Sequence, residues 1–211
     1  MHDTLNKALS WRYAVKTFDP AQKITDAELH TILESGRMAP SSLGIEPWKF
    51  IVVSDPDIQA KMRTASYDQS KVSDASHVVV LARRTDVREN IVCELLERTA
   101  KAQGKDTSEL KEQGDMVTGT IASKSDAELD AWVRAQTYIP LGMMVETAAL
   151  LGVDTGPMEG FSPDEIDTIL GLKEKNLRAT TMLALGRLGA DAFAAIPKIR
   201  RDFNEVVEFV K

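Results

Sequence analysis

The sequence predicts one layered α+β domain with four or five strands and six or more helices. Two observations lead to this class. Short, apolar, β-branched runs alternate with longer segments of helical periodicity, and no internal repeat or low-complexity tract interrupts the order. The chain has 211 residues, and a domain usually holds ~150. We therefore expect a single unit over residues 1–211.

Local start signals predict the helices. In a capping box, a Ser or Thr hydroxyl and a Glu carboxylate three residues later satisfy free amide groups at a helix start. Three such boxes occur, at Thr25–Glu28, Ser125–Glu128 and Ser162–Glu165. Together with apolar spacing and proline at first helical positions, they predict helices over 3–11, 26–37, 56 onward, 86–103, 125–151 and 163–171.

Apolar runs predict the strands. The clearest run is 77–82, which is continuous, as in strands covered on both faces. The final run, 206–210, has no obvious local partner, so we expect it to pair with another subunit. The predicted strands are 48–53, 77–82, 153–157, 179–185 and 206–210.

Three segments break this regular pattern. Residues 39–47 hold two prolines and a glycine, which predict an irregular loop. Residues 104–124 are polar and contain three glycines, so we expect a mobile excursion with a helix at about 107–117. Pro140 lies inside the predicted long helix, where a proline removes a backbone hydrogen bond at a cost of ~3 kcal/mol. We expect a kink there or two abutting helices.

Charge and composition exclude several function classes. The formal net charge is −6, whereas general nucleic-acid binders usually carry a basic surface. A single cysteine, Cys93, excludes an internal disulfide and cysteine-cluster metal sites, and the three histidines are scattered. No apolar run approaches the ~20 residues that span a bilayer. We expect a cytoplasmic protein with no metal, nucleic acid or membrane among its partners.

The residues alone leave the chemistry open. No nucleophile elbow, phosphate-binding P-loop or dinucleotide fingerprint occurs. Five cations that are distant in sequence could form one basic pocket for an anionic cofactor, or they could be solvated surface charges. These cations are Arg12, Lys16, Lys71, Lys198 and Arg200. The loop 40–48 and the turn 157–160 could likewise bind a ligand or only turn the chain.

Six segments in collinear order resemble one known family. They are RYAVKTFD (12–19), APSSLGIEPWKFIVV (39–53), DASHVVV (74–80), LGVDTGPMEGF (151–161), LGLKEK (170–175) and IPKIRRDFNEVV (196–207). With them the chain resembles the FMN-dependent nitroreductase family over essentially its whole length. The similarity is greatest to the branch of oxygen-insensitive NAD(P)H nitroreductases, flavin reductases and dihydropteridine reductases. It implies a mostly antiparallel four- to five-stranded sheet, a homodimer with FMN at the subunit interface, and exchange of the C-terminal strand.

The resemblance implies how the chain would hold FMN. Arg12, Lys198 and Arg200 would hold the phosphate, while Lys16 and Lys71 would face the pyrimidine edge of the flavin. Two-electron reduction places negative charge on that edge, so fixed cations there stabilise the reduced form more than the oxidised one.

Other residues would complete the implied site. The Glu159 backbone N–H would point at flavin N5, and Pro40–Ser42 would come from the other subunit. Ala14 lacks a hydroxyl found in the family, and Asp68 replaces an Asn of close relatives, which is unfavourable unless Asp68 pairs with a lysine. The implied cofactor-binding residues, none of them a catalytic side chain, are Arg12, Tyr13, Ala14, Lys16, Pro40, Ser41, Ser42, Gly44, Asp68, Lys71, Gln136, Pro157, Met158, Glu159, Gly160, Lys198 and Arg200.

The implied activity is two-electron reduction of nitroaromatics, quinones or similar planar acceptors. NADH or NADPH would deliver a hydride to the flavin, which the acceptor would then take in a ping-pong cycle. Two alternatives stay open: a dedicated flavin, pteridine or enone reductase on the same fold, and a non-catalytic FMN-binding redox sensor or carrier.

A few single residues have more ordinary expected roles. The excursion 104–124 would lie over the open face of the flavin, where Val117 and Thr118 would form a wide mouth without an aromatic side chain. We expect His77 and Cys93 in the core. The three tryptophans are expected as core or dimer contacts.

Overall fold

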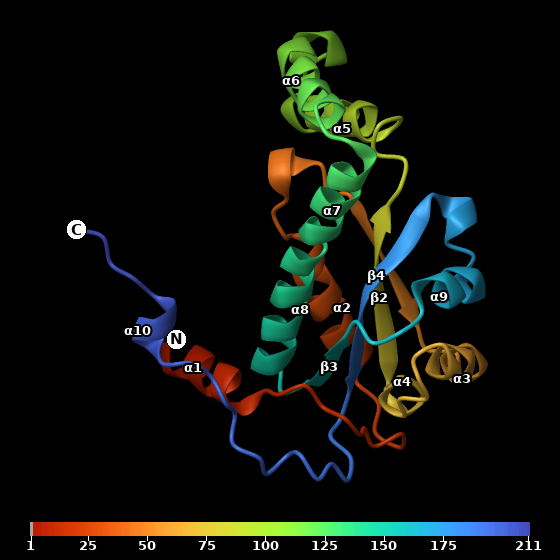
Figure 1. Cartoon of the computed structure of the whole chain (residues 1–211), viewed down its shortest axis with the longest axis vertical. Coiled ribbons are helices and arrows are strands. Elements are labelled where there is room, and N and C mark those ends of the chain that lie inside the picture. Colours follow the sequence, from red (N-terminus) through yellow and green to blue (C-terminus); the bar gives the residue numbers. More distant parts are fainter. Residues whose placement is uncertain (1) are drawn as a thin grey trace.

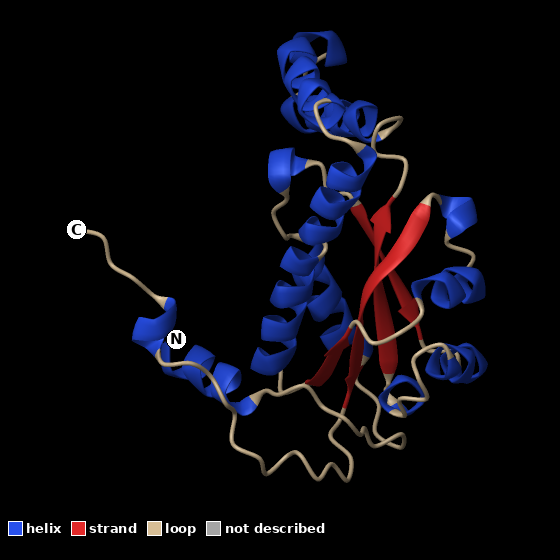
Figure 2. Cartoon of the chain, in the orientation of Figure 1, coloured by secondary structure: helices blue, strands red, loops and turns tan. Residues whose placement is uncertain are grey.

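The computed structural model describes residues 2–211 and is built around one sheet. Its four strands are antiparallel and lie in the order β1–β2–β4–β3 (Figure 2). They are β1 (Trp48–Val53), β2 (His77–Arg84), β3 (Asp154–Met158) and β4 (Leu177–Gly186). The predicted α+β class and the four internal strands are confirmed.

Helices cover both faces of the sheet (Figure 1). Along β2, Val79 and Leu81 pack on one face, while Val78, Val80 and Ala82 pack on the other. All five are fully buried, which explains why the run is continuously apolar. The covering helices are α2 (Asp26–Arg37) and α8 (Tyr138–Leu150) on the first face, and α3 (Pro56–Thr64), α4 (Lys71–Asp74) and α9 (Pro163–Leu170) on the second.

The predicted long helix is two abutting helices. The first, α7 (Asp126–Gln136), is separated from α8 by a single residue, Thr137. Pro140 is the third residue of α8, within the first turn. Amide groups in a first turn have no intrahelical partner, so the proline removes no hydrogen bond there. The two helices together form a column along the sheet (Figure 1).

Two of the three predicted capping boxes form. Thr25 Oγ1 accepts from the Glu28 amide at 3.2 Å, and the Glu28 carboxylate accepts from the Thr25 amide at 2.8 Å. The box at Ser125 has the same pattern. The box predicted at Ser162 is wrong, because the Ser162 amide donates to the Ala65 carbonyl at 2.8 Å and is unavailable to the glutamate.

The polar excursion is helical and projects beyond one end of the sheet (Figure 1). Helix α5 begins at Ile91 rather than at residue 86, because residues 87–90 form a turn after Asp86. Val117 is fully buried against Ile45, so its predicted place at an open mouth is wrong. Residues 104–124 comprise η2 (Thr107–Leu110) and α6 (Lys111–Ala122), and they follow α5 (Ile91–Gln103).

The C-terminal tail differs from its prediction. The short helix α10 (Phe203–Val206) occupies the start of the expected last strand, and residues 207–211 form no ladder within the described chain. A strand requires a neighbour, and no strand of this chain lies beside the tail. The tail instead passes the N-terminal helix α1 (His2–Trp11), as Figure 1 shows. Exchange with a second subunit stays a prediction.

Several single-residue expectations are also resolved. Cys93 is exposed on α5, so its predicted core position is wrong. Trp11 is 49% exposed and is not a core residue of the chain. His77 is half-buried, and its Nδ1 lies 3.0 Å from Ser76 Oγ. None of the helices among residues 2–211 combines the length and the apolar character that a bilayer crossing requires.

Candidate functional site

The segment that carries Arg12 to Lys16 runs beside β3. Ala14 forms a parallel bridge with Thr155, and the Val15 amide donates to the Thr155 carbonyl at 3.0 Å. A Cβ on Gly156 would lie 3.0 Å from the Val15 carbonyl oxygen, so a larger residue would force the two segments slightly apart. The pairing brings the N-terminal cations to the side of the sheet on which the turn 157–160 begins.

Lys71 and Lys16 lie close together beside this junction. Lys71 is 4% exposed, and its stem passes 3.4 Å from the position that a Gly156 Cβ would take. Burial, and then repulsion from Lys16, lower the pKa of Lys71. Within residues 2–211 the Lys71 ammonium has no hydrogen bond or ion pair. A partly desolvated cation beside a second cation is unfavourable, and an anion bound there would relieve this.

A second group of cations forms where the tail crosses α1. Burial, and then repulsion from Arg200, lower the pKa of Arg12, and burial followed by repulsion from Arg12 and Arg200 lowers that of Lys198. Arg12 Nε is buried and has no partner among the described residues. Lys198 Nζ donates to the Leu9 carbonyl, which holds the tail against α1. Folding therefore brings together three cations that are almost 190 positions apart in the chain.

Asp191 is a neighbour of these cations that sequence reasoning missed. One of its carboxylate oxygens accepts from the Tyr13 hydroxyl at 2.9 Å, the Lys16 amide at 2.7 Å and the Thr17 amide at 3.3 Å. Burial, and then this hydrogen bond, raise the pKa of Tyr13. No motif marks Asp191, because its partners are distant in sequence.

The turn 157–160 lies at the end of β3, where a cavity opens. The cavity has a volume of about 260 Å³ and is lined by Leu141, Pro157, Met158, Glu159 and Thr181. Leu141 and Thr181 are lining residues that the sequence did not indicate. The Thr181 hydroxyl is buried without a partner in the described chain, as is that of Thr155 on β3.

Side chains from other elements hold the same turn. Gln69 Nε2 donates to the Gly160 carbonyl at 2.7 Å, and Arg134 of α7 pairs with the Glu159 carboxylate at 3.1 Å. Asp68, next to Gln69, pairs with Arg63 at 2.7 Å, and the lysine pairing considered for it is not formed. The Asp68 carboxylate is therefore already neutralised.

The remaining predicted site residues gather at a different place. The Ser42 amide donates to Gln136 Oε1 at 2.8 Å, and Ser41 Oγ accepts from the Glu46 amide at 2.8 Å. Arg98 donates to the Gly44 carbonyl at 2.8 Å, which links this loop to α5. The loop therefore lies beside the junction of α7 and α8, at Gln136. The predicted site residues thus fall into two groups within one chain.

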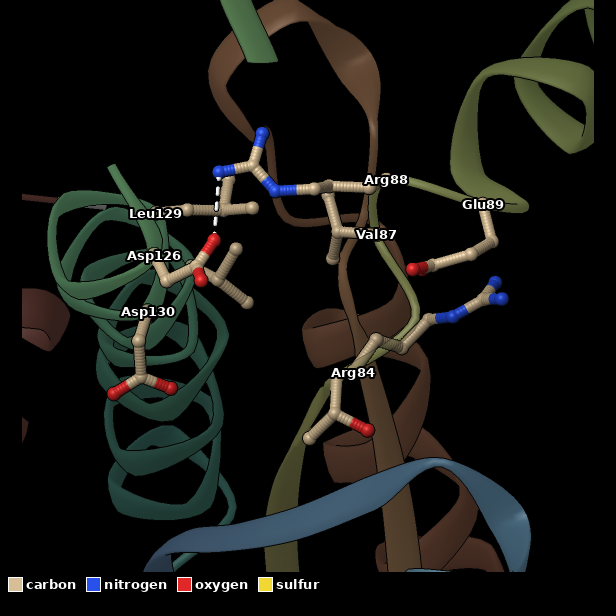
Figure 3. A pocket seen from close by; sticks show the side chains of 9 residues that line it. Arg84, Val87, Arg88, Glu89, Asp126, Leu129 and Asp130 are labelled. Carbon is tan, nitrogen blue, oxygen red and sulfur yellow. Dashed lines mark hydrogen bonds and ion pairs between the residues drawn. The ribbon is translucent and has the colours of Figure 1, made fainter. Parts of the chain in front are cut away.

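Another cavity, of about 210 Å³, lies between the end of β2 and α7 (Figure 3). Its arginines are already neutralised, since Arg84 pairs with Asp86 at 2.7 Å and Arg88 pairs with Asp126 at 3.0 Å. Arg88 also donates to the Ile121 carbonyl at 3.0 Å, at the end of α6. This cavity is therefore a structural junction that attaches the excursion to the sheet. The described residues contain no cluster of acidic, histidine or cysteine side chains arranged to hold a metal ion.

Comparison with known proteins identifies a family and solved structures to which the chain is similar. A model described as the nitroreductase family matches residues 9–187. A Staphylococcus aureus protein named as an inferred NAD(P)H nitroreductase is 37% identical, over all of this chain and 97% of the relative. The solved structure of an inferred nitroreductase from Bacillus subtilis has a TM-score of 0.87 at 20% identity and covers 100% of both chains. That of an inferred nitroreductase from Exiguobacterium sibiricum, in complex with FMN, has a TM-score of 0.82 at 21% identity, over 98% of this chain and 97% of that one.

Proposed function

The chain belongs to the nitroreductase family, and from this premise we propose that it is an NAD(P)H-dependent oxidoreductase that uses FMN. Its proposed acceptors are nitroaromatics, quinones and similar planar compounds. The observation that carries the proposal is the set of buried or half-buried cations that the folded chain leaves without anionic partners. They are Lys71, whose stem lies beside Gly156, and Arg12 with Lys198, where the tail meets α1.

The residues present fit FMN at its phosphate end. Arg12 has a buried Nε without a partner in the described chain. Burial, and then repulsion from Arg200, lower the pKa of the Arg12 guanidinium. A dianionic phosphate would pair the buried Nε and offset the repulsion, because guanidinium groups form strong charge-assisted hydrogen bonds to phosphate oxygens. Arg12, Lys198 and Arg200 are therefore proposed to hold the phosphate.

Residues near Gly156 fit the flavin end. Bound FMN would supply the ring that takes a hydride from NADH or NADPH and gives it to the acceptor. Lys16 and Lys71 would stabilise negative charge at the pyrimidine edge, because fixed cations act most strongly where charge develops. The Glu159 amide, in a turn held by Gln69 and Arg134, would point at N5. Ala14 would offer only its backbone.

The second group of residues is proposed to act on the site of another copy. Ser42 lies beside Gln136, the last residue of α7, where α7 meets α8, whereas Lys198 lies against α1 through the Leu9 carbonyl. A homodimer in which each chain contributes one group to each site would unite them. Arg98 joins this loop to α5, the helix that precedes the excursion, and the excursion would then lie over the open face of the partner's flavin.

The visible spectrum of the purified protein tests the proposal. We expect a flavin spectrum that bleaches under anaerobic conditions with NADH or NADPH and returns on addition of a quinone or nitroaromatic acceptor. Rates over a panel that includes free flavin, pteridines and enones identify the preferred acceptor class. A flavin spectrum that neither nucleotide bleaches would favour a redox sensor or carrier. A colourless protein that FMN cannot reconstitute would contradict the proposal.

A further inference from the structure

Asp191 lies where the chain leaves β4 and becomes the C-terminal tail. Just before it, the Gly189 amide donates to the Thr17 carbonyl at 3.0 Å, so the two segments already run side by side. The Asp191 carboxylate extends this contact to residues 13–17 through three hydrogen bonds to one oxygen. The other oxygen accepts from the Phe193 amide at 2.9 Å, which starts the next turn of the tail. Both oxygens of this carboxylate therefore accept hydrogen bonds from the protein.

Beyond Asp191 the tail is weakly held. In the described chain, its only later hydrogen bond to the rest of the protein is from Lys198 Nζ to the Leu9 carbonyl. Nearly every residue after Asp191 is exposed. Asp191 is therefore the last residue before Lys198 at which the described tail is hydrogen-bonded to the rest of the protein, and the segment it holds, 13–17, directly follows Arg12.

We propose that Asp191 is a positioning residue that fixes the start of the tail against residues 13–17, so that Lys198 and Arg200 meet Arg12 around a phosphate group. This inference rests on the proposed FMN site. It adds a residue that no motif of the chain identifies and that does not itself touch the cofactor.

The sign of the effect separates this role from that of a nearby charge. A carboxylate beside an anion site opposes anion binding, so its removal alone would tighten the binding of a phosphate. Loss of an anchor weakens the binding of a phosphate, because the tail cations must then lose conformational freedom when the ligand binds. The two roles predict opposite changes in affinity.

The experiment compares two ligands that differ only in the phosphate. FMN and riboflavin are titrated into cofactor-free wild type, Asp191→Ala, Asp191→Asn and the control Glu208→Ala, which removes an exposed tail carboxylate. We expect Asp191→Ala to weaken FMN binding about tenfold, or about 1.4 kcal/mol, with riboflavin affinity unchanged. Asp191→Asn should fall between, since its amide oxygen still accepts hydrogen bonds, and the control should match wild type. Unchanged or tighter FMN binding, or an equal loss for both ligands, would overturn the proposal.

A double-mutant cycle tests whether Asp191 acts through the tail cations. In the background Lys198→Ala/Arg200→Ala, Asp191→Ala should cause no further loss of FMN affinity, because nothing is left to position. An additive loss would contradict this route. The melting temperature of each cofactor-free variant identifies any that fails to fold, and in that case Asp191→Asn carries the comparison.

Proteolysis of the cofactor-free protein tests the anchoring role of Asp191 without any flavin. Trypsin should cleave cofactor-free Asp191→Ala faster than wild type at Lys198, Arg200 and Arg201, because an unanchored tail is more accessible. Equal cleavage rates would show that Asp191 is no anchor. If wild type binds neither flavin, the proposed function fails, and the cleavage rates alone then decide the role of Asp191.

Discussion

Lys71 illustrates how a single residue can be held in an unfavourable state until a ligand arrives. Its stem is buried, its neighbour Lys16 repels it, and the described chain offers it no anion. Burial first, and then Lys16, lower its pKa from an ordinary 10.5. Between the folded pKa and 10.5 the unfolded chain binds more protons than the folded one, so stability rises with pH there. Below the folded pKa the whole destabilising effect of the charged Lys71 is present.

We therefore expect Lys71→Met to stabilise the cofactor-free protein. Met has a volume similar to that of Lys but carries no charge. Removing this partly desolvated, unpaired charge should add about 1 kcal/mol or less to the free energy of unfolding, or at most about 2–4 °C in melting temperature. Lys16→Met should stabilise the protein by less, because Lys16 is exposed and its removal relieves only the repulsion of Lys71, while both variants should lower the reduction potential of bound FMN. The advantage of Lys71→Met should shrink as pH rises toward 10.5. A cofactor-free Lys71→Met protein less stable than wild type would contradict this account.

At the scale of the element, Thr25 and Ser162 both match the capping-box pattern, but only one of them caps its helix. Thr25 caps α2 through a complete box, whereas the Ser162 side chain makes no capping bond to α9. Thr25→Ala should therefore cost about 1 kcal/mol of stability, and Ser162→Ala should cost almost nothing. Chemical denaturation of the two variants measures both values. Equal losses would mean that Ser162 caps its helix in solution.

This contrast shows what can be predicted from sequence and what cannot. Helix starts, buried strands and the α7–α8 break depend on neighbours within a few positions, so local patterns predicted them. The failed cap depends on the Ala65 carbonyl, almost a hundred positions from Ser162. Sequence spacing likewise could not decide whether the five cations form one pocket or are solvated surface charges. Only the fold brings Arg12, Lys198 and Arg200 together, and only the fold identifies Asp191.

At the scale of the whole molecule, the predicted site residues lie in two groups that one chain does not bring together. The first group comprises the tail cations, the segment 12–16, Lys71 and the turn 157–160, and the second comprises the loop 40–44 with Gln136. A closed two-fold dimer can bring the first group of each copy against the second group of the other. This arrangement predicts that two variants, each with substitutions in a different group, restore FMN binding when they form a mixed dimer.

Lys198→Ala/Arg200→Ala damages the first group, and Ser42→Trp, which places a bulky ring in the cleft, damages the second. Each protein alone should bind little FMN. After subunit exchange in an equal mixture, half the dimers are mixed and each has one intact site, so about one quarter of the sites should recover. Mixing Lys198→Ala/Arg200→Ala with Lys16→Glu, which damages the same group, should restore none. Failure of the first mixture to recover FMN, despite confirmed exchange, would mean that each site is completed within one chain.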